Sequence, residues 1–568
     1  MILEKLIQTG RGEIPADIVL KNCQLVNVVS GEIYPADIAL CEDRIAGIGT
    51  YQGEKEIDLK GNYVVPGFID AHMHIESSMV EVPEFAKTVV PLGTTAVIAD
   101  PHEISNVMGT AGISYILKSS KYNPLSVYVM LSSCVPATHL ETAGAELKAV
   151  DLYGLLQDKW VLGLAEVMNY PGLLNRDPDV LDKIRLAGGK QIDGHAPGLS
   201  GKDLNGYAAA GIHSDHECAT PEEAMEKLRL GMHIMIREGT VARNMKDLLP
   251  VINEHTASQC MFCTDDRTPL DLLTRGHINS MIREAVEWGL NPVTAIRIAS
   301  LNTARYFGLT HMGAVAPGLM ADFNILENLK DFNPVRVYKN GVLVAERGEI
   351  TSPPAERKYF PLRSSVNVKW LYEENFRIPA KEGSARVIGI HPGQITTTNL
   401  RELPKIENGF VVADTDRDIL KIAVVERHHA TGNMGLGLVK GFGLKSGAIA
   451  SSVAHDSHNL IAVGTNDQDL FAAIVQLVRM QGGITAVKDG EVLESLPLPI
   501  AGLLSNRPLR EVADKLESLK GAAKSLGCAV EDPFMLMAFL ALTVIPELKI
   551  SDLGLVDVVQ FKIVDLFE

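Results

Sequence analysis

The chain has 568 residues, with 53 Lys and Arg against 70 Asp and Glu, so its formal net charge is −17. Hydrophobic residues make up 46% and charged residues 22%, a balance that is typical of an ordinary globular protein and excludes global disorder. The acidic surplus argues against nucleic acid as a partner, because a phosphate-binding surface needs a basic patch. At about 150 residues per domain the length indicates three or four domains, although one α/β barrel can use about 250 residues.

The N-terminus and the cysteines predict a cytoplasmic protein. Glu4 and Lys5 precede any apolar stretch, so we expect no secretory signal. The sequence lacks a run of about 18 apolar residues, and we therefore expect no membrane span. The seven cysteines are an odd and scattered set, which fits a reducing compartment better than a disulfide framework.

The predicted elements begin with short strands over residues 17–65, where β-rich runs are separated by Gly, Asn or Asp. From Pro66 the pattern changes to alternating strands and helices. Eight β-rich runs lie between residues 63 and 266: YVVPGFIDAHMH, TTAVIAD, SVYVMLSS, VLGLAEVM, QIDGHAP, IHSDHE, HIMIREG and MFCTDD. Alternating strands and helices predict a parallel sheet, and eight such units predict an α/β fold of the closed (β/α)8 barrel type.

The segment that follows the eighth run predicts one helix over residues 291–309, with Asn291 as N-cap and Pro292 at its first position. Strand patterns return at Gly313, and Lys339-Asn340-Gly341 predicts a hairpin turn. We expect these late strands to join the early strands in a small composite β-sandwich domain made from both flanks of the barrel.

Proline-rich and polar residues over 351–368 predict a linker, and mixed α/β patterns follow it. The expected organisation is therefore residues 1–65 and 313–365 in the composite β domain, residues 66–312 in the catalytic barrel, and residues 366–568 in an additional C-terminal α/β domain.

Polar side chains end most of the eight runs, and in a barrel of this type those ends meet at one mouth. His72 and His74 are two apart on a strand, so both imidazoles point to the same face. Imidazole nitrogen suits Zn, Fe, Mn and Ni, and the pair predicts metal ligation. Glu166 ends a very apolar strand, where a lone carboxylate is costly unless it joins a buried ion pair or binds a metal.

His195 and His216 end the next two runs. Each alone is as compatible with a hydrogen-bonded core histidine as with a ligand, but with the His-x-His pair they supply enough imidazoles for two metal ions. Asp265 ends the eighth run, where it can ligate a metal and accept a proton from water. Asp266 is the alternative, and strand alternation predicts that the two carboxylates face opposite ways.

Further polar groups stand near the predicted mouth without a settled role. Asp100, His102 and Glu103 follow the second run, where they can hold substrate, relay protons, bind an extra metal or only support a loop. Asp215, and Glu217 beside it, can orient His216 by hydrogen bonding or can be solvated acids.

The C-terminal region carries five more polar groups in apolar surroundings: His428, His429, His455, Asp456 and His458. They can line or cap the pocket, bind a further metal, or be hydrogen-bonded residues of a domain interface.

The set of motifs resembles the amidohydrolase superfamily and, within it, the bacterial adenine deaminase family. The resemblance lies in PGFIDAHMHIESSM, ADPHEI, LAEVMN, GHAPGLSG, SDHE, CTDDR and GAVAPGLMADF, and it continues through RHHATGN and SVAHDSHN. It covers essentially the whole chain, including the last 200 or so residues.

The resemblance implies a two-metal centre, usually of manganese (Mn²⁺) and otherwise of Fe²⁺ or Zn²⁺. His72, His74 and Asp265 would hold one metal, His195 and His216 the other, and Glu166 would bridge them. It also implies hydrolytic deamination of adenine to hypoxanthine and ammonia in purine salvage, with Asp265 moving the proton, and a homo-oligomer.

Two other readings remain in view. A cyclic amidohydrolase of the hydantoinase or dihydroorotase type would use the same metals, although many such relatives bridge with a carboxylated lysine where this sequence has Glu166. A non-catalytic binding protein on the same barrel would have lost ligands, and none of the six is missing.

Overall fold

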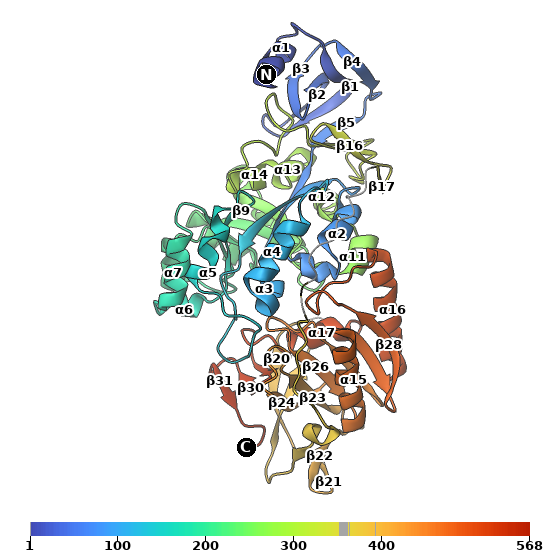
Figure 1. The fold of residues 1–568 in the computed structure, drawn as a ribbon. Helices are drawn as coiled ribbons and strands as arrows, with labels where there is room; N and C mark the ends of the chain where they lie inside the picture. Colours follow the sequence, from blue (N-terminus) through green and yellow to red (C-terminus); the bar gives the residue numbers. More distant parts are fainter. Residues whose placement is uncertain (1, 352–361, 363, 392–393) are drawn as a thin grey trace.

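The computed structural model of the protein describes residues 2–351, 362, 364–391 and 394–568. Figure 1 shows three parts that follow one another along the long axis, with an N-terminal sheet at one end and the C-terminal region at the other. Most of the predicted linker, residues 352–361 and 363, lies outside the described residues.

A nine-stranded sheet combines strands from both flanks of the central part, in the order β17-β16-β15-β14-β5-β1-β2-β3 with β4 paired to β1. Its halves meet where β5 and β14 pair antiparallel, with Val65 opposite Asn324. Asn340 and Gly341 have positive φ angles of 51° and 75°, as the predicted hairpin turn between β15 and β16 requires. The strands are β1 (Ala16–Asn27), β2 (Glu32–Cys41), β3 (Arg44–Ile48), β4 (Gly53–Asp58), β5 (Tyr63–Pro66), β14 (Phe323–Leu326), β15 (Arg336–Lys339), β16 (Val342–Glu346) and β17 (Glu349–Ile350).

A helix at the N-terminus, α1 (Ile2–Gly10), was not predicted from the sequence. Its Leu6 packs against a cluster of buried sheet residues that includes Val19 and Ala39. The helix is short, and this packing of one apolar side chain on the sheet stabilises it more than local propensity does.

The central part is a curled set of parallel strands in two sheets, in the orders β10-β9-β8-β7-β6 and β11-β12-β13. Main-chain hydrogen bonds link their neighbouring edges, because the Asp265 N–H donates to the His72 carbonyl (3.0 Å) and the His213 N–H to the Ile192 carbonyl (3.2 Å). All eight predicted runs contain a strand: β6 (Phe68–Met73), β7 (Thr94–Ala99), β8 (Ser126–Leu131), β9 (Val161–Val167), β10 (Gln191–Gly194), β11 (Ser214–Asp215), β12 (His233–Arg237) and β13 (Cys260–Cys263).

Helices connect these strands and cover their outer faces (Figure 1). They are α2 (Val82–Val89), α3 (His102–Met108), α4 (Thr110–Ser119), α5 (Ala149–Tyr153), α6 (Tyr170–Leu174), α7 (Pro178–Leu186), α8 (Gly201–Ala209), α9 (Pro221–Arg229), α10 (Met245–Leu248), α11 (Pro269–Thr274) and α12 (Ile278–Glu287).

The single helix predicted over 291–309 is wrong, because the structure has two helices there, α13 (Pro292–Ile298) and α14 (Leu301–Tyr306). Asn291 is the N-cap as predicted and accepts hydrogen bonds from the next two free N–H groups. The break falls at Ser300, whose backbone is not helical and whose hydroxyl donates to the Ile296 carbonyl at 2.6 Å. A serine side chain that bonds the preceding turn in this way competes with the helical ladder.

The C-terminal region is built on an eight-stranded sheet in the order β20-β19-β24-β23-β26-β25-β27-β28, with two small three-stranded sheets beside it. Its strands are β18 (Ile378–Pro379), β19 (Ala385–Ile390), β20 (Thr397–Glu402), β21 (Lys405–Glu407), β22 (Phe410–Val412), β23 (Ile419–Val425), β24 (Met434–Lys440), β25 (Ala448–Ser451), β26 (Leu460–Gly464), β27 (Gly483–Lys488), β28 (Glu491–Pro497), β29 (Leu548–Ser551), β30 (Gly554–Asp557) and β31 (Lys562–Val564). Its helices are α15 (Asp467–Met480), α16 (Leu509–Ser525) and α17 (Pro533–Phe539).

The C-terminal region packs directly against the central part. Ser505 exchanges main-chain hydrogen bonds with the segment after β6, donating to the Met79 carbonyl at 2.8 Å and accepting from the Glu81 N–H at 3.2 Å. The loop between β25 and β26 also contacts the central part, because His455 and His458 of this loop pair with Glu103 of α3.

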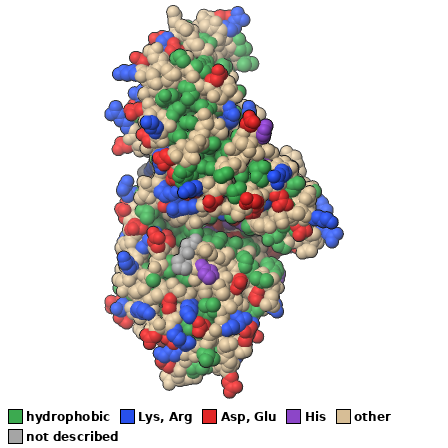
Figure 2. All heavy atoms as spheres, turned by 180° about the vertical axis from the view of Figure 1, so that it is seen from behind, with side chains coloured by type: hydrophobic (Ala, Val, Ile, Leu, Met, Phe, Trp, Pro, Cys, Tyr) green, Lys and Arg blue, Asp and Glu red, His purple; other side chains and the backbone are tan. Residues whose placement is uncertain are grey.

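On the face seen in Figure 2, basic and acidic side chains are interspersed. Among the helices of the described residues, none has both the length and the apolar character that crossing a membrane requires.

Candidate metal centre

The six predicted ligands come together at the carboxyl ends of the parallel strands. Each is almost fully buried except His195, which is partly exposed. They follow or end five of the strands: His72 and His74 at β6, Glu166 at β9, His195 after β10, His216 after β11 and Asp265 after β13.

Glu166 stands at the centre of this cluster. Its Oε1 lies 3.7 Å from His72 Nε2 and 3.5 Å from His74 Nε2. Its Oε2 lies 2.7 Å from His195 Nδ1 and 3.2 Å from His216 Nε2. The two carboxylate oxygens thus face two separate pairs of imidazoles.

Asp265 faces the first of these pairs. Its Oδ1 lies 3.1 Å from His74 Nε2 and 3.5 Å from His72 Nε2. The predicted opposite facing of Asp265 and Asp266 is wrong, because both carboxylates line the same cavity. Strand β13 ends at Cys263 and Asp265 has a left-handed φ of 54°, so the alternation of an extended strand no longer applies.

The buried nitrogen atoms of this cluster fit a metal site. His72 Nε2, which faces Glu166 and Asp265, is buried without a hydrogen-bond partner, and the His72 and His216 rings stack with centroids 4.2 Å apart. His74 Nδ1 lies 2.9 Å from the Asp100 carbonyl, so Nδ1 carries the proton and the Nε2 lone pair faces the cluster. Imidazole nitrogens and carboxylates are the donors that Mn, Fe and Zn take in proteins.

The electrostatics keep both carboxylates ionised. Burial alone raises the pKa of Glu166, but the charge of His216 and hydrogen bonds from His102 and His195 hold it well below its usual range. Burial likewise raises the pKa of Asp265, and the positive charge of Arg237 outweighs it and holds that pKa well below normal.

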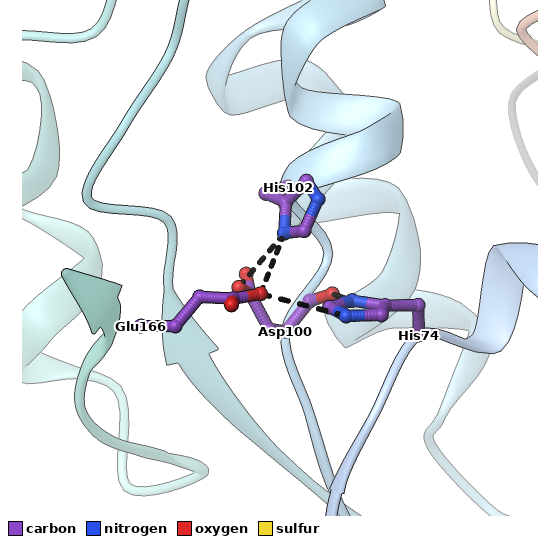
Figure 3. Close-up of side chains that lie close together, drawn as sticks. All are labelled: His74, Asp100, His102 and Glu166. Carbon is purple, nitrogen blue, oxygen red and sulfur yellow. Dashed lines mark hydrogen bonds and ion pairs between the residues drawn. The ribbon is translucent and has the colours of Figure 1, made fainter. Parts of the chain in front are cut away.

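His102 is a closer neighbour of the cluster than the sequence indicated. It begins α3, and its Nδ1 lies 2.9 Å from Asp100 Oδ2 and 3.3 Å from Glu166 Oε1. Figure 3 shows His102 and His74 approaching the Glu166 carboxylate from different elements. One ligand atom from each of His74, Asp100, His102 and Glu166 falls within 4.8 Å of the others, which makes Asp100 and His102 further candidate ligands.

Glu103, His455 and His458 form a second cluster that joins the central part to the C-terminal region. Glu103 Oε1 lies 2.6 Å from His455 Nδ1, and Glu103 Oε2 pairs with His458 Nε2. His458 Nδ1 accepts the Ala454 N–H at 3.1 Å, so Nε2 carries the proton and donates to Glu103. This arrangement leaves His458 no lone pair for a metal and makes the cluster a hydrogen-bonded anchor.

Asp215 is neither a solvated acid nor hydrogen-bonded to His216, the two alternatives that the sequence left open. Its Oδ1 accepts the Ala196 N–H at 2.8 Å, and its Oδ2 pairs with the buried Lys227 at 3.0 Å. Asp215 therefore supports the segment that carries His195. The reason is geometric: Asp215 lies within β11 and points away from the cavity, whereas His216 follows the strand's last residue.

Sequence reasoning missed Arg237 at the end of β12. Its guanidinium donates to Asp265 Oδ2 at 2.8 Å and to both oxygens of Glu217. The signal available in the sequence was position, because Arg237 lies near the carboxyl end of the seventh run, as the candidate ligands do in theirs.

The C-terminal region closes one side of the cavity. His455 and Asp456 line it beside the metal-ligand candidates, whereas His428 bonds the Ser457 carbonyl and His429 the Ala143 carbonyl. The remaining wall is apolar and comes mainly from Met168, Val241, Ile395, Phe539, Leu542, Val544 and Ile545.

Two family models match the chain. Residues 63–344 match the amidohydrolase family, and residues 394–562 match the adenine deaminase C-terminal domain. Among solved structures, the dihydropyrimidinase from Brevibacillus agri NCHU1002 aligns with a TM-score of 0.45 and 13% identity over 59% of this chain and 96% of that one.

Curated relatives match from end to end. The chain is 52% identical to an adenine deaminase from Desulfatibacillum aliphaticivorans over 100% of both chains. It is 51% identical to adenine deaminase 2 from Carboxydothermus hydrogenoformans over 99% of each. Identity at this level over the full length shows that the chain belongs to the adenine deaminase family, with an amidohydrolase fold and extra sheet regions.

Proposed function

We propose that this protein is a metal-dependent hydrolase that converts adenine to hypoxanthine and ammonia. The observation that carries the proposal is the full-length identity to adenine deaminases, together with the clustering of all six candidate ligands, five of which line one cavity while His72 faces Glu166 and Asp265 beside it. The cyclic amidohydrolase alternative is not favoured, because the relatives that match the whole chain carry the name adenine deaminase.

In this proposal His72, His74 and Asp265 would hold one divalent metal ion, His195 and His216 would hold a second, and Glu166 would contribute to both. The opposed facing of the two Glu166 oxygens supports the bridging role. When bound, such ions lower the pKa of water so that hydroxide is available at neutral pH. We propose Mn²⁺ as the native metal, with Fe²⁺ or Zn²⁺ as substitutes.

The protein's own residues position and move the proton. Asp265 accepts a proton from the water that attacks the ring carbon and returns it to the exocyclic amino group as the C–N bond breaks, so that adenine and water give hypoxanthine and ammonia. Arg237 holds Oδ2 of the same carboxylate, which fixes its orientation. The apolar wall excludes water from the other faces of the substrate, which strengthens each of these interactions.

We further infer that the eight parallel strands form a closed (β/α)8 barrel over residues 66–312. Residues 1–65 and 313–365 would form the composite β-sandwich domain, and residues 366–568 an α/β domain. The hydrogen bonds between neighbouring sheet edges and the mixed origin of the nine-stranded sheet support this division. We also propose a cytoplasmic homo-oligomer that acts in purine salvage.

The test is an ammonia-release assay on adenine, adenosine, cytosine and hydantoin, with added Mn²⁺ and with a chelator. We expect ammonia from adenine alone, loss of activity with the chelator and recovery with Mn²⁺. Ring opening of hydantoin without ammonia release from adenine would refute the proposal.

A further inference from the structure

Asp456 brings a carboxylate into the cavity from the C-terminal region. It is 4% exposed, and its Oδ2 is buried without a hydrogen-bond partner. The other carboxylates of the cavity are engaged by side chains of the protein: Glu103 by His455 and His458, Glu166 by His195 and His216, Glu217 and Asp265 by Arg237, and Asp266 by Ser77. Among the cavity carboxylates that the structure describes, Asp456 alone has a fully buried oxygen with no such partner.

The surroundings of Asp456 suit a flat heterocycle. Phe539, Leu542 and Ile545 contribute apolar wall to the same cavity. The His455 ring stacks on Phe539 with centroids 4.8 Å apart and planes 19° from parallel, and Glu103 holds His455 at 2.6 Å. An aromatic wall held in this way, beside one unpaired acceptor, favours a planar ligand with an N–H at its edge.

Adenine has only two groups that donate hydrogen bonds, the exocyclic amino group and one ring N–H, and this identifies the edge that Asp456 can bind. The exocyclic amino group belongs to the reacting carbon, which must face the Glu166 and Asp265 side of the cavity. The pyrimidine-ring nitrogens are acceptors, and an ionised carboxylate is an acceptor only. The remaining donor is the N–H of the imidazole ring, on N9 or N7 according to the tautomer. In a nucleoside a sugar replaces that hydrogen at N9.

We propose that Asp456 accepts the imidazole N–H of the purine and thereby selects the free base over the nucleoside. The inference rests on the proposed function and adds to it a residue that recognises the imidazole edge of the substrate. A substrate without this N–H would leave the buried carboxylate unpaired, which is a strong basis for rejection.

The test compares manganese-loaded wild-type enzyme with Asp456→Ala and Asp456→Asn, on adenine and on 9-methyladenine. Loss of a hydrogen bond to a charged group corresponds to a rise of about 10- to 100-fold in KM for adenine. We expect kcat to change little, because the contact is made equally in the ground and transition states. The preference for adenine over 9-methyladenine should fall at least about tenfold in Asp456→Ala.

The matched control is Glu141→Gln. Glu141 is a buried carboxyl with one unpartnered oxygen, as Asp456 is, but it does not line the cavity. We expect its KM for adenine and its preference for adenine to stay at the wild-type values. Circular dichroism and metal content of each variant show whether it is folded and loaded.

Calorimetry measures the affinities for adenine and 9-methyladenine at equilibrium, and it therefore tests the Asp456 contact independently of turnover. If the wild-type enzyme releases no ammonia but Asp456→Ala binds adenine more weakly than the wild type does, the proposed function is refuted and the Asp456 contact with adenine is still supported. Unchanged adenine affinity and unchanged preference in folded, metal-loaded Asp456→Ala would overturn the inference. A loss confined to kcat would also overturn it, since it would place Asp456 at the reacting edge.

Discussion

Arg237 donates a hydrogen bond of 2.8 Å to Asp265 Oδ2, and Oδ1 of the same carboxylate lies 3.1 Å from His74 Nε2. The two oxygens of Asp265 therefore have different partners, one a guanidinium and the other the metal-ligand candidates. This division fixes the orientation of the carboxylate and keeps it ionised.

Replacing Asp265 by Asn should lower kcat for adenine by about 10²- to 10⁴-fold, because the amide cannot accept a proton as the carboxylate does. Adenine binding should remain measurable by calorimetry. The matched control is Asp266→Asn, which removes the neighbouring carboxylate that accepts a hydrogen bond from Ser77. We expect kcat to fall less than about tenfold in Asp266→Asn. An equal fall in kcat in the two variants would contradict the proton-transfer role of Asp265.

Replacing Arg237 by Met should both destabilise the protein and lower activity. The change leaves the buried carboxylates of Asp265 and Glu217 without their cation, and removing one partner from a buried ion pair costs about 3–5 kcal/mol. Urea unfolding and kcat/KM measure the two effects. Arg243→Met, at a half-exposed arginine that donates to the Thr240 carbonyl, is the control and should cost under about 1 kcal/mol. Equal stability of the two variants would contradict the inferred burial of the Arg237 pairs.

The Glu103 anchor should couple stability to substrate binding. In Glu103→Gln the charge-assisted hydrogen bonds to His455 and His458 become neutral ones. The free energy of unfolding should fall by about 1.5–3 kcal/mol. The KM for adenine should rise because His455 and its stacked partner Phe539 line the cavity. Glu76→Gln is the control, since the new amide oxygen can still accept the Ile104 N–H. Wild-type melting temperature and KM in Glu103→Gln would show that the anchor is dispensable.

Lys549 should make stability rise with pH. It is fully buried, and its Nζ donates to the carbonyls of Ile395 and Phe539. Burial lowers the pKa of Lys549 from 10.5 to about 7, so between about pH 7 and 10.5 the unfolded chain binds more protons than the folded one. Stability therefore increases across that window, by at most about 5 kcal/mol at about 1.4 kcal/mol per pH unit.

The measurement is the urea unfolding free energy at pH 7 and pH 9.5 for the wild type and for Lys549→Met. The unfolding free energy of Lys549→Met should rise less between pH 7 and pH 9.5 than that of the wild type. Relative to the wild type, the variant should therefore be more stable at pH 7 than at pH 9.5. Identical pH profiles for the two proteins would mean that Lys549 does not titrate in this range.

The sequence by itself determined the strand pattern and most of the centre. Runs of β-rich residues separated by helical patterns carry a local periodicity, and the polar residue that ends each run follows from that pattern. Six candidate ligands could therefore be proposed without coordinates, because parallel strands bring their carboxyl ends to one edge: His72, His74, Glu166, His195, His216 and Asp265.

Only the tertiary structure decided the relationships that depend on distant segments or on local backbone. The left-handed backbone at Asp265 turned both it and Asp266 into the cavity, which alternation along a strand cannot foresee. Arg237 gained its role from a carboxylate 28 residues later in the chain. Glu103 and His458 are 355 residues apart, and only the packing of the C-terminal region on the central part brings them together. Periodicity reports on neighbours in sequence, whereas the chemistry of a buried charge is set by its neighbours in space.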